Sequence, residues 1–535
     1  MSNSTQNATL TFSLPFKKPT NWPIFLTVAV SIATICAQFT VVQGGLLNWS
    51  YDSGVYLGAA IHTLHGVLPY RDFTFVQPPG IIYMMLPPAL LQWLIGGSAS
   101  LGLARLMCMI IMVVNVGYVT YLLRRWGRTA QVVAGLALAL WIGTIGLDWA
   151  IMMDPYLLLF TAMSIEYLIR STESEDFASK NLRLSGIFLG IAMLMKLWAA
   201  FPMIPILLVA LTWHRRKGLS LLWNATMTFF VASLPFILGA PVKFFQFNVV
   251  VQFTRSLHPI SSTEINDRLN AFGNFLVYPI GHIGNAGTIF IVTLALVGFL
   301  LSIVKKSVEQ AFLIVLVMGL ILCLYSLVQT TLMPPYYLYF GTLFGVCLLG
   351  VTAEVLRRGI SRYLKALGIG RTGLVVLIAI GLLAGTWYLQ QNVAGISAYN
   401  LTELNHNASL GTLNFFKVIP NGACVQTNDP YILVYSGLID SNVPGCPAEL
   451  DPYGIWLFKA PHSVDVNGTP ESALVAQEWQ QFLSKSQYYV ESPGLRYLLP
   501  NDSFLRAWFS HHFIEISRTD HLIIYENNSL MKTGN

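Results

Sequence analysis

Charged residues are scarce in this sequence. Asp, Glu, Lys and Arg account for 10% of the 535 residues, and hydrophobic residues account for 54%. A soluble domain carries about 25% charged residues, so the shortage excludes an ordinary soluble protein and places most of the chain in lipid. The formal net charge of +6 does not indicate nucleic-acid binding, because the basic residues fall between apolar runs and form no single patch.

Motifs of nucleotide, dinucleotide and zinc chemistry are missing as well. The sequence has no Walker loop, no GxGxxG that follows a strand, no HExxH and no CxxC. Nucleotide hydrolysis, dinucleotide redox chemistry and zinc hydrolysis therefore have no support. We expect no cofactor, although the carboxylates predicted outside the membrane could hold a divalent metal ion.

Cysteine is rare too, with 6 residues in the chain. Four lie inside apolar runs, where a lone thiol behaves as a small hydrophobic group: Cys36, Cys108, Cys323 and Cys347. Cys424 and Cys446 lie in a polar tail. Their short separation favours a disulfide in an oxidising compartment, and two unpaired thiols are the alternative.

Apolar runs of about 20 residues, the length that crosses a bilayer, recur along most of the chain. They predict a polytopic α-helical membrane protein with about eleven transmembrane helices. The most distinct runs cover residues 23–47, 101–123, 129–147, 151–169, 218–239, 286–304, 310–328, 336–356 and 372–389.

Two segments do not fit a simple span. Residues 184–213 leave room only for a hairpin of two half-length helices, broken around Lys196 and Pro202. Residues 81–95 carry Pro87 and Pro88, and we expect this short helix to lie against the membrane.

Basic residues fix the orientation. They fall on alternate loops, near residues 17–18, 124–128, 170–183, 215–217, 305–306 and 357–371. The positive-inside rule makes that face cytoplasmic. The protein is therefore predicted to be a multi-pass protein of the plasma membrane, with Asp52, Asp72, Asp148, Asp154 and the C-terminal tail outside.

Three parts follow from this topology. Residues 1–22 are a disordered cytoplasmic N-terminus, and residues 23–391 form the membrane domain, with outer loops at 48–80 and 241–285. Residues 392–535 form an extracytoplasmic α/β domain. In that domain we expect helices near 413–418, 431–436 and 471–484, a strand at 423–426, and a terminal hairpin of strands 513–517 and 521–525.

Asp52 follows the first apolar run directly. A carboxylate at membrane depth costs roughly 2.5–3.5 kcal/mol and marks a functional site. We interpret Asp52 as a general base that takes the proton of an acceptor hydroxyl. The alternative is a helix cap for a helix that begins near Ser53.

The same outer loop supplies further candidates. Arg71 could bind a leaving phosphate, or it could simply pair with its neighbour Asp72. Tyr56 and His62 are candidate contacts for an acceptor or a sugar. His62 and His65 lie one helical turn apart, but a surface role is favoured over a metal site.

Two charged residues stand at the ends of later spans. Asp154 precedes Pro155, so it either satisfies free N–H groups at the start of a helix or shares a cavity with Asp52. Lys196 is an isolated charge inside the apolar hairpin. It either snorkels to the surface or lines a water-filled cavity and binds a phosphate.

Two further candidates lie in the later outer segments. Arg255 is a reasonable phosphate clamp, although its loop could equally be an amphipathic helix at the interface. Tyr336 and Tyr337 lie at the outer boundary, where belt aromatics are common, and a sugar or lipid contact is the alternative.

Three stretches carry a family resemblance. They read YDSGVYLGAAIHTLHGVLPYRDF with a following QPPG, then MMDPYLLLF, and then GIFLGIAMLMKLWAAFPMIPIL. With many spans and an exported tail, the chain resembles the GT-C superfamily of membrane glycosyltransferases, which includes the protein O-mannosyltransferases and the lipid A aminoarabinose transferases. That family often has two adjacent acidic residues in the first loop. Here Ser53 follows Asp52, so the base assignment depends on Asp52 alone.

The resemblance implies an inverting glycosyltransferase that moves a sugar from a polyprenyl-phosphate donor to an extracytoplasmic glycan, lipid or protein. Asp52 would be the base and Asp154 would assist, while Lys196, Arg255 or Arg71 would bind the donor phosphate. The predicted partners are this donor, membrane lipid and the acceptor, with no nucleic acid. The alternative is a transporter or flippase of a lipid-linked precursor, which the absence of a matching second broken hairpin disfavours.

Overall fold

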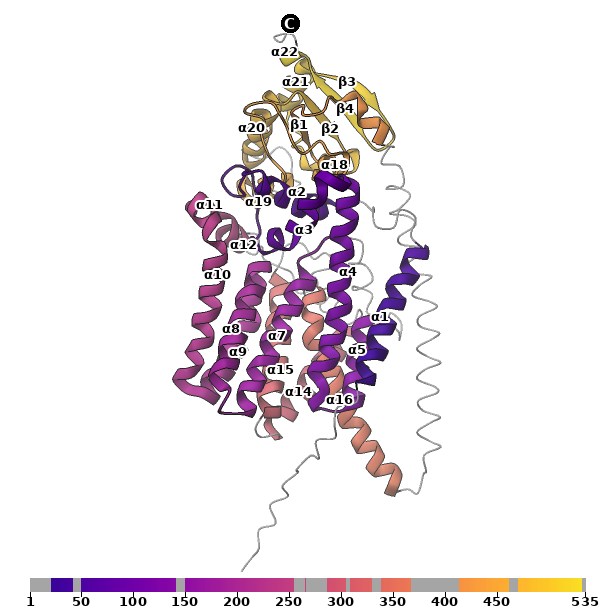
Figure 1. The fold of residues 1–535 in the computed structure, drawn as a ribbon, viewed down its shortest axis with the longest axis vertical. Coiled ribbons are helices and arrows are strands. Elements are labelled where there is room, and N and C mark those ends of the chain that lie inside the picture. Colours follow the sequence, from indigo (N-terminus) through magenta and orange to yellow (C-terminus); the bar gives the residue numbers. More distant parts are fainter. Residues whose placement is uncertain are drawn as a thin grey trace, which may run out of the picture.

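The structure is a computed structural model that describes residues 21–41, 50–140, 150–254, 265, 286–304, 308–329, 338–366, 413–460 and 470–531. A bundle of long helices carries a smaller α/β domain on one of its ends (Figure 1). The long helices are α1 (Trp22–Val41), α4 (Gly97–Leu122), α5 (Arg128–Ala139), α7 (Asp154–Glu173), α8 (Ala178–Met195), α9 (Ala200–His214), α10 (Leu219–Gly239), α14 (Ala286–Val304), α15 (Val308–Gln329) and α16 (Leu338–Ala366).

Small residues let the bundle helices pack closely. Gly186 and Gly190 on α8 form a GxxxG pattern, and a Cβ at either position would overlap a backbone carbonyl of α10, at Leu221 and Ala225 respectively. Helices in lipid have no hydrophobic force to join them, so this close backbone approach supplies the packing.

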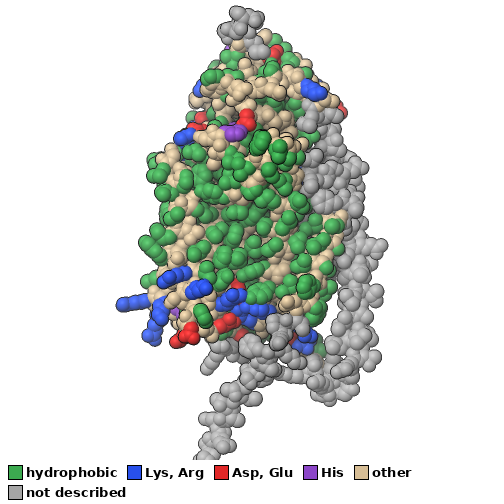
Figure 2. Space-filling model, in the orientation of Figure 1, with side chains coloured by type: hydrophobic (Ala, Val, Ile, Leu, Met, Phe, Trp, Pro, Cys, Tyr) green, Lys and Arg blue, Asp and Glu red, His purple; other side chains and the backbone are tan. Residues whose placement is uncertain are grey.

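Four helical stretches among the described residues are long and apolar enough to cross a membrane: Gly97–Arg125, Leu197–Gly239, Val308–Ser326 and Tyr339–Ile360. The visible surface has a broad apolar band, and Lys and Arg side chains gather at the end away from the α/β domain (Figure 2). The total of about eleven spans stays a prediction. The span predicted at residues 372–389 lies outside the described residues.

The structure differs from the predicted hairpin in two respects. Helix α8 begins at Ala178 and has 18 residues, so it is not half-length. The break falls at Lys196, whose backbone is extended, and a short helix η3 (Leu197–Ala199) leads into α9. Pro202 does not break the chain but lies in the first turn of α9. A proline is tolerated there because its missing N–H would have had no partner inside the helix.

Short elements lie at both ends of the bundle. Helices α2 (Tyr51–Leu64) and α3 (Gly80–Ile95) lie between the bundle and the α/β domain (Figure 1). Elsewhere the chain forms η2 (Leu123–Arg125), η4 (Arg215–Gly218), α11 (Pro241–Phe245), η5 (Gln246–Val250) and α12 (Val251–Thr254).

The α/β domain contains a four-stranded sheet in the order β1-β2-β4-β3. Strand β1 (Val425–Thr427) is parallel to β2 (Tyr488–Glu491), while β4 (Ile523–Asn527) is antiparallel to both β2 and β3 (Phe513–Arg518). The hairpin of β3 and β4 lies where the sequence predicts it. The helical elements of the domain are η8 (Leu413–Val418), α18 (Pro430–Ser436), α19 (Pro452–Lys459), α20 (Pro470–Ser484), η9 (Pro493–Leu498), α21 (Ser503–His512) and α22 (Asn528–Met531). Cys424 and Cys446, the pair considered above, form a disulfide.

Candidate functional site

The first turn of α2 carries Asp52. Ser50 is the N-cap of this helix, and its hydroxyl accepts a hydrogen bond from the backbone N–H of Ser53. The structure therefore corrects the alternative in which Asp52 itself caps the helix. Asp52 is the second residue of the helix, in its first turn, where the positive end of the helix dipole stabilises a carboxylate.

The bundle holds this turn from one side. The Ser53 hydroxyl accepts a hydrogen bond of 2.9 Å from the backbone N–H of Ile151. Ile151 lies in a buried segment that leads directly into α7, whose first residue is Asp154. The turn that carries Asp52 and the helix start that carries Asp154 are therefore adjoining segments.

Asp154 forms an ion pair with Lys196. The Lys196 ammonium lies 3.2 Å from the Asp154 carboxylate, and the two residues are 4% and 1% exposed. The ammonium also lies 4.1 Å from the centre of the Trp198 ring. The extended backbone at the helix break lets Lys196 reach this position, because a residue inside α8 would follow the helix face.

The start of α3 packs against the same break. A Cβ at Gly80 would overlap the backbone carbonyl of Leu194, two residues before Lys196. The start of α3 therefore lies beside the break after α8. Three of the predicted residues, Asp52, Asp154 and Lys196, lie on segments that are linked to one another: the first turn of α2, the start of α7 and the break after α8.

Other predicted residues of the outer loop lie elsewhere. Arg71 is exposed and donates to the Asp72 carboxylate at 2.7 Å and to the Gly66 carbonyl. Tyr56 is buried and its ring meets the edge of Phe75.

His62 is buried against Phe73, and burial lowers the pKa of its imidazole to about 4, so the ring is neutral near pH 7. Together with His65 it lines a cavity of ≈ 440 Å³ between the end of α2 and the α/β domain. The part of the chain that the structure describes holds no group of three or more His, Cys, Asp or Glu suited to a metal ion. Arg255, Tyr336 and Tyr337 lie outside the described residues.

The α/β domain contributes residues that sequence reasoning missed. The Tyr51 hydroxyl donates to Asp451 at 2.9 Å, and the backbone N–H of Thr74 donates to Glu449 at 3.0 Å. Burial raises the pKa of the Glu449 carboxyl and raises that of Asp451 to about 7. The one available signal was Asp451-Pro452, which is typical of a helix start.

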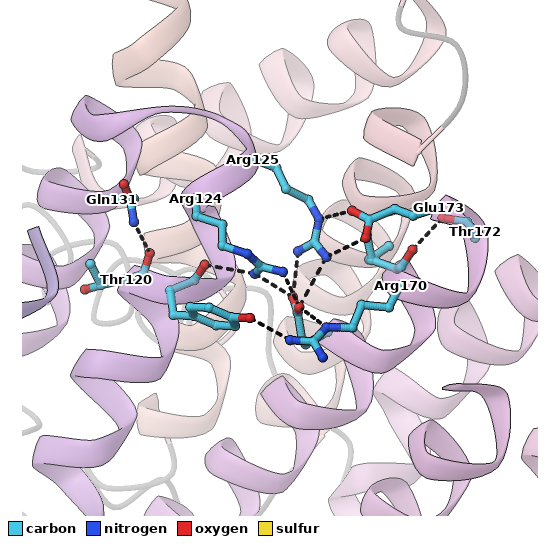
Figure 3. Close-up of polar contacts among 10 residues, drawn as sticks. Thr120, Arg124, Arg125, Gln131, Arg170, Thr172 and Glu173 are labelled. Atoms are coloured by element: carbon cyan, nitrogen blue, oxygen red, sulfur yellow. Dashed lines mark hydrogen bonds and ion pairs between the residues drawn. The ribbon is translucent and has the colours of Figure 1, made fainter. Parts of the chain in front are cut away.

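A second charged cluster lies toward the far end of α7 (Figure 3). The fully buried Glu166 carboxylate accepts hydrogen bonds from Arg124, Arg125 and Arg170, and Arg125 also pairs with Glu173. The cluster joins η2, which follows α4, to the later part of α7, away from Asp154. It fixes the bundle and shares no residue with the site.

The fold and the site define an integral membrane protein that presents carboxylates and a buried lysine beneath a docked α/β domain. Residues 76–242 match the family described as dolichyl-phosphate-mannose-protein mannosyltransferase. No curated protein matches the chain by sequence.

Solved structures cover almost the whole chain. ArnT from Cupriavidus metallidurans in the apo state is 14% identical with a TM-score of 0.55, covering 95% of this chain and 98% of that one. The same protein bound to undecaprenyl phosphate is 13% identical with a TM-score of 0.51, at the same coverage of 95% and 98%. The apo oligosaccharyltransferase of Archaeoglobus fulgidus is 12% identical with a TM-score of 0.52, covering 96% of this chain and 75% of that one.

These structural similarities show the fold. The chain has the GT-C fold of integral membrane glycosyltransferases, and the resemblance predicted from the sequence is confirmed. The predicted enzyme class, a GT-C glycosyltransferase, agrees with both the family match and the structural similarity.

Proposed function

We propose that the protein is an inverting membrane glycosyltransferase that moves a sugar from a polyprenyl-phosphate donor to an acceptor outside the cytoplasm. The observation that carries this proposal is the buried Asp154–Lys196 pair at a helix break, beside the turn that carries Asp52. The ArnT structure bound to undecaprenyl phosphate, which shares the fold, supports a lipid phosphate as the donor's carrier.

The chemistry needs a base and a cation. Asp52 takes the proton of the acceptor hydroxyl as its oxygen attacks the anomeric carbon of the sugar. The bond from that carbon to the phosphate oxygen breaks, and the lipid phosphate leaves with the electron pair. Attack opposite the leaving group inverts the anomeric configuration.

The Lys196 ammonium stabilises the negative charge that develops on the leaving phosphate. A fixed ammonium in a site poor in water stabilises that charge more than a solvated one does. Asp154 positions the ammonium through their ion pair. Arg255 stays a predicted second cation, and Arg71 could serve only by exchanging its bond to Asp72 for one to phosphate.

The orientation predicted from the sequence is part of the proposal. Lys and Arg gather at the end of the bundle away from the α/β domain (Figure 2), as they do on cytoplasmic faces. The Cys424–Cys446 disulfide suits an oxidising compartment. An impermeant thiol reagent should label Asp520→Cys, an exposed turn position, in right-side-out vesicles. Labelling only in inside-out vesicles would contradict this orientation.

The test of function is sugar transfer by the purified full-length protein. Labelled polyprenyl-phosphate sugars are offered with envelope lipid, glycan and protein fractions as acceptors. We expect Asp52→Asn to lower transfer about 10²–10⁴-fold, the range for a general base. Asp520→Asn removes an exposed carboxylate in the turn between β3 and β4 and should leave transfer unchanged.

Two outcomes would contradict the proposal. Full transfer by Asp52→Asn would remove this residue from the reaction. Donor-dependent flux across vesicles without a covalent product would favour the transporter alternative. The proton coupling constant at the product's anomeric carbon, measured by NMR, tests inversion directly.

A further inference from the structure

Three consecutive residues, Tyr51, Asp52 and Ser53, form the first turn of α2. The outer two are bonded to different parts of the molecule. Ser53 is bonded to the bundle through Ile151, and Tyr51 is bonded to the α/β domain through Asp451, which is 400 residues away in the sequence. Asp52 lies between these two attachments.

The Tyr51 hydroxyl makes two hydrogen bonds, one as the donor and one as the acceptor. It donates to the Asp451 carboxylate at 2.9 Å and accepts from the backbone N–H of Tyr453, also at 2.9 Å. Asp451 is the N-cap of α19 and also accepts from the backbone N–H of Gly454. The tyrosine hydroxyl therefore supplies a partner for an N–H that the helix start would otherwise leave unsatisfied.

The surroundings keep Asp451 in place. The Glu449 carboxylate accepts from the backbone N–H groups of Leu450 and Asp451, and its other oxygen accepts from Thr74 in the first outer loop. A Cβ at Gly54 would overlap the backbone of α18, so α2 lies directly on the domain. The domain therefore acts as a rigid partner for the first turn of α2.

We propose that Tyr51 and Asp451 are positioning residues for sugar transfer, through which the α/β domain sets the direction of the Asp52 carboxylate. This inference depends on the function proposed above. On this proposal the docked α/β domain contributes to the reaction, because it helps to position Asp52. A misplacement of about 1 Å at a reacting group can cost about 10²-fold in rate.

The decisive variant is Tyr51→Phe. It removes both hydroxyl bonds but keeps the ring, which packs against the buried apolar residues of both the bundle and the domain. The matched control is Tyr525→Phe, which removes a tyrosine–carboxylate bond of 3.1 Å to Glu491 elsewhere in the same domain.

The experiment measures kcat and the KM for the donor with purified full-length protein, together with Tm. We expect Tyr51→Phe to lower kcat about 10–100-fold with a donor KM within twofold of wild type. Asp451→Ala should behave in the same way. Asp451→Asn keeps an oxygen that can accept both hydrogen bonds, so it should recover most of the rate.

Three results would overturn the inference. They are a Tyr51→Phe rate equal to that of Tyr525→Phe, a change confined to KM, or equal rates for Asp451→Asn and Asp451→Ala. The proposed function fails separately, and it is tested first: absence of transfer by the wild type, or full transfer by Asp52→Asn, would remove both proposals. Transfer that Asp52→Asn lowers but Tyr51→Phe leaves unchanged would remove only the positioning role of Tyr51 and Asp451.

Discussion

Lys196 and Asp154 face each other across 42 residues of sequence, with the ammonium 3.2 Å from the carboxylate and both groups buried. Taking two charges out of water is costly, and their mutual attraction offsets that cost only while both are present. The pair therefore links the start of α7 to the break between α8 and α9.

Removing one charge of this pair should destabilise the protein more than removing both. We expect Asp154→Asn to lower the free energy of unfolding by about 3–5 kcal/mol, because a buried ammonium loses its counter-charge. The double variant Asp154→Asn/Lys196→Met should recover at least half of that loss. Thermal unfolding in detergent measures it, and strictly additive effects would show that the two charges are not coupled.

Gly54 and Gly58 provide a matched pair on one face of α2. A Cβ at Gly54 would overlap the backbone of α18, whereas a Cβ at Gly58 would meet the Leu450 methyl at 3.2 Å, where a side chain can shift. We expect Gly54→Ala to cost about 1–3 kcal/mol by overpacking and Gly58→Ala to cost less. Limited proteolysis should then cleave the α/β domain faster in Gly54→Ala only. Equal proteolysis of both variants would contradict the close approach of α2 and α18.

The stability of the docked domain should depend on pH through Asp451. Burial raises the pKa of its carboxyl from the ordinary value of 3.8 to about 7, and the nearby Glu449 adds to this. Between these values the folded state binds a proton that the unfolded state releases, so stability falls as pH rises from about 4 toward 7.

Asp451→Asn has no carboxyl at this position and therefore isolates the effect. At pH 5 the variant and the wild type should unfold at similar temperatures, because Asp451 is then protonated. At pH 8 the variant should have the higher Tm, because only the wild type carries a buried charge there. A difference in Tm that stays constant from pH 5 to pH 8 would contradict a raised pKa at Asp451.

Variants of Glu166 and Glu173 compare the contribution of a buried ion cluster with that of a more exposed ion pair. Glu166 is fully buried and faces three arginines, whereas the Glu173 side chain is 39% exposed and faces Arg125. We expect Glu166→Gln to cost about 3–5 kcal/mol, because it leaves buried cations uncompensated. Glu173→Gln should cost less than about 1 kcal/mol. Equal shifts in the thermal unfolding of the two variants would contradict this assignment.

Local patterns in the sequence located several features well. The lone charge of Lys196 in an apolar stretch marked the helix break, because a buried ammonium needs a partner that an unbroken apolar helix does not offer. The strand-like stretches on either side of Arg518-Thr519-Asp520 marked the hairpin of β3 and β4. In both cases the deciding interactions lie close together in the chain.

Long-range partners could not be predicted in the same way. Nothing local distinguishes Tyr51 from other aromatic residues of the outer loop, and its partner Asp451 resembles an ordinary helix cap. The choice of Ser50 over Asp52 as the cap of α2 was also missed. Either side chain suits a cap, and the hydrogen bond from the Ile151 N–H to the Ser53 hydroxyl, which helps fix the register, is tertiary.

The bond between Tyr51 and Asp451 also has a consequence for biosynthesis. The ribosome makes α2 early, and the acceptor for its first side chain emerges 400 residues later. Nascent or prematurely terminated chains would already be inserted in the bilayer while the turn around Asp52 is still held from one side only. On the function proposed above, catalytic competence would then arise only after the α/β domain has been made and has docked on α2.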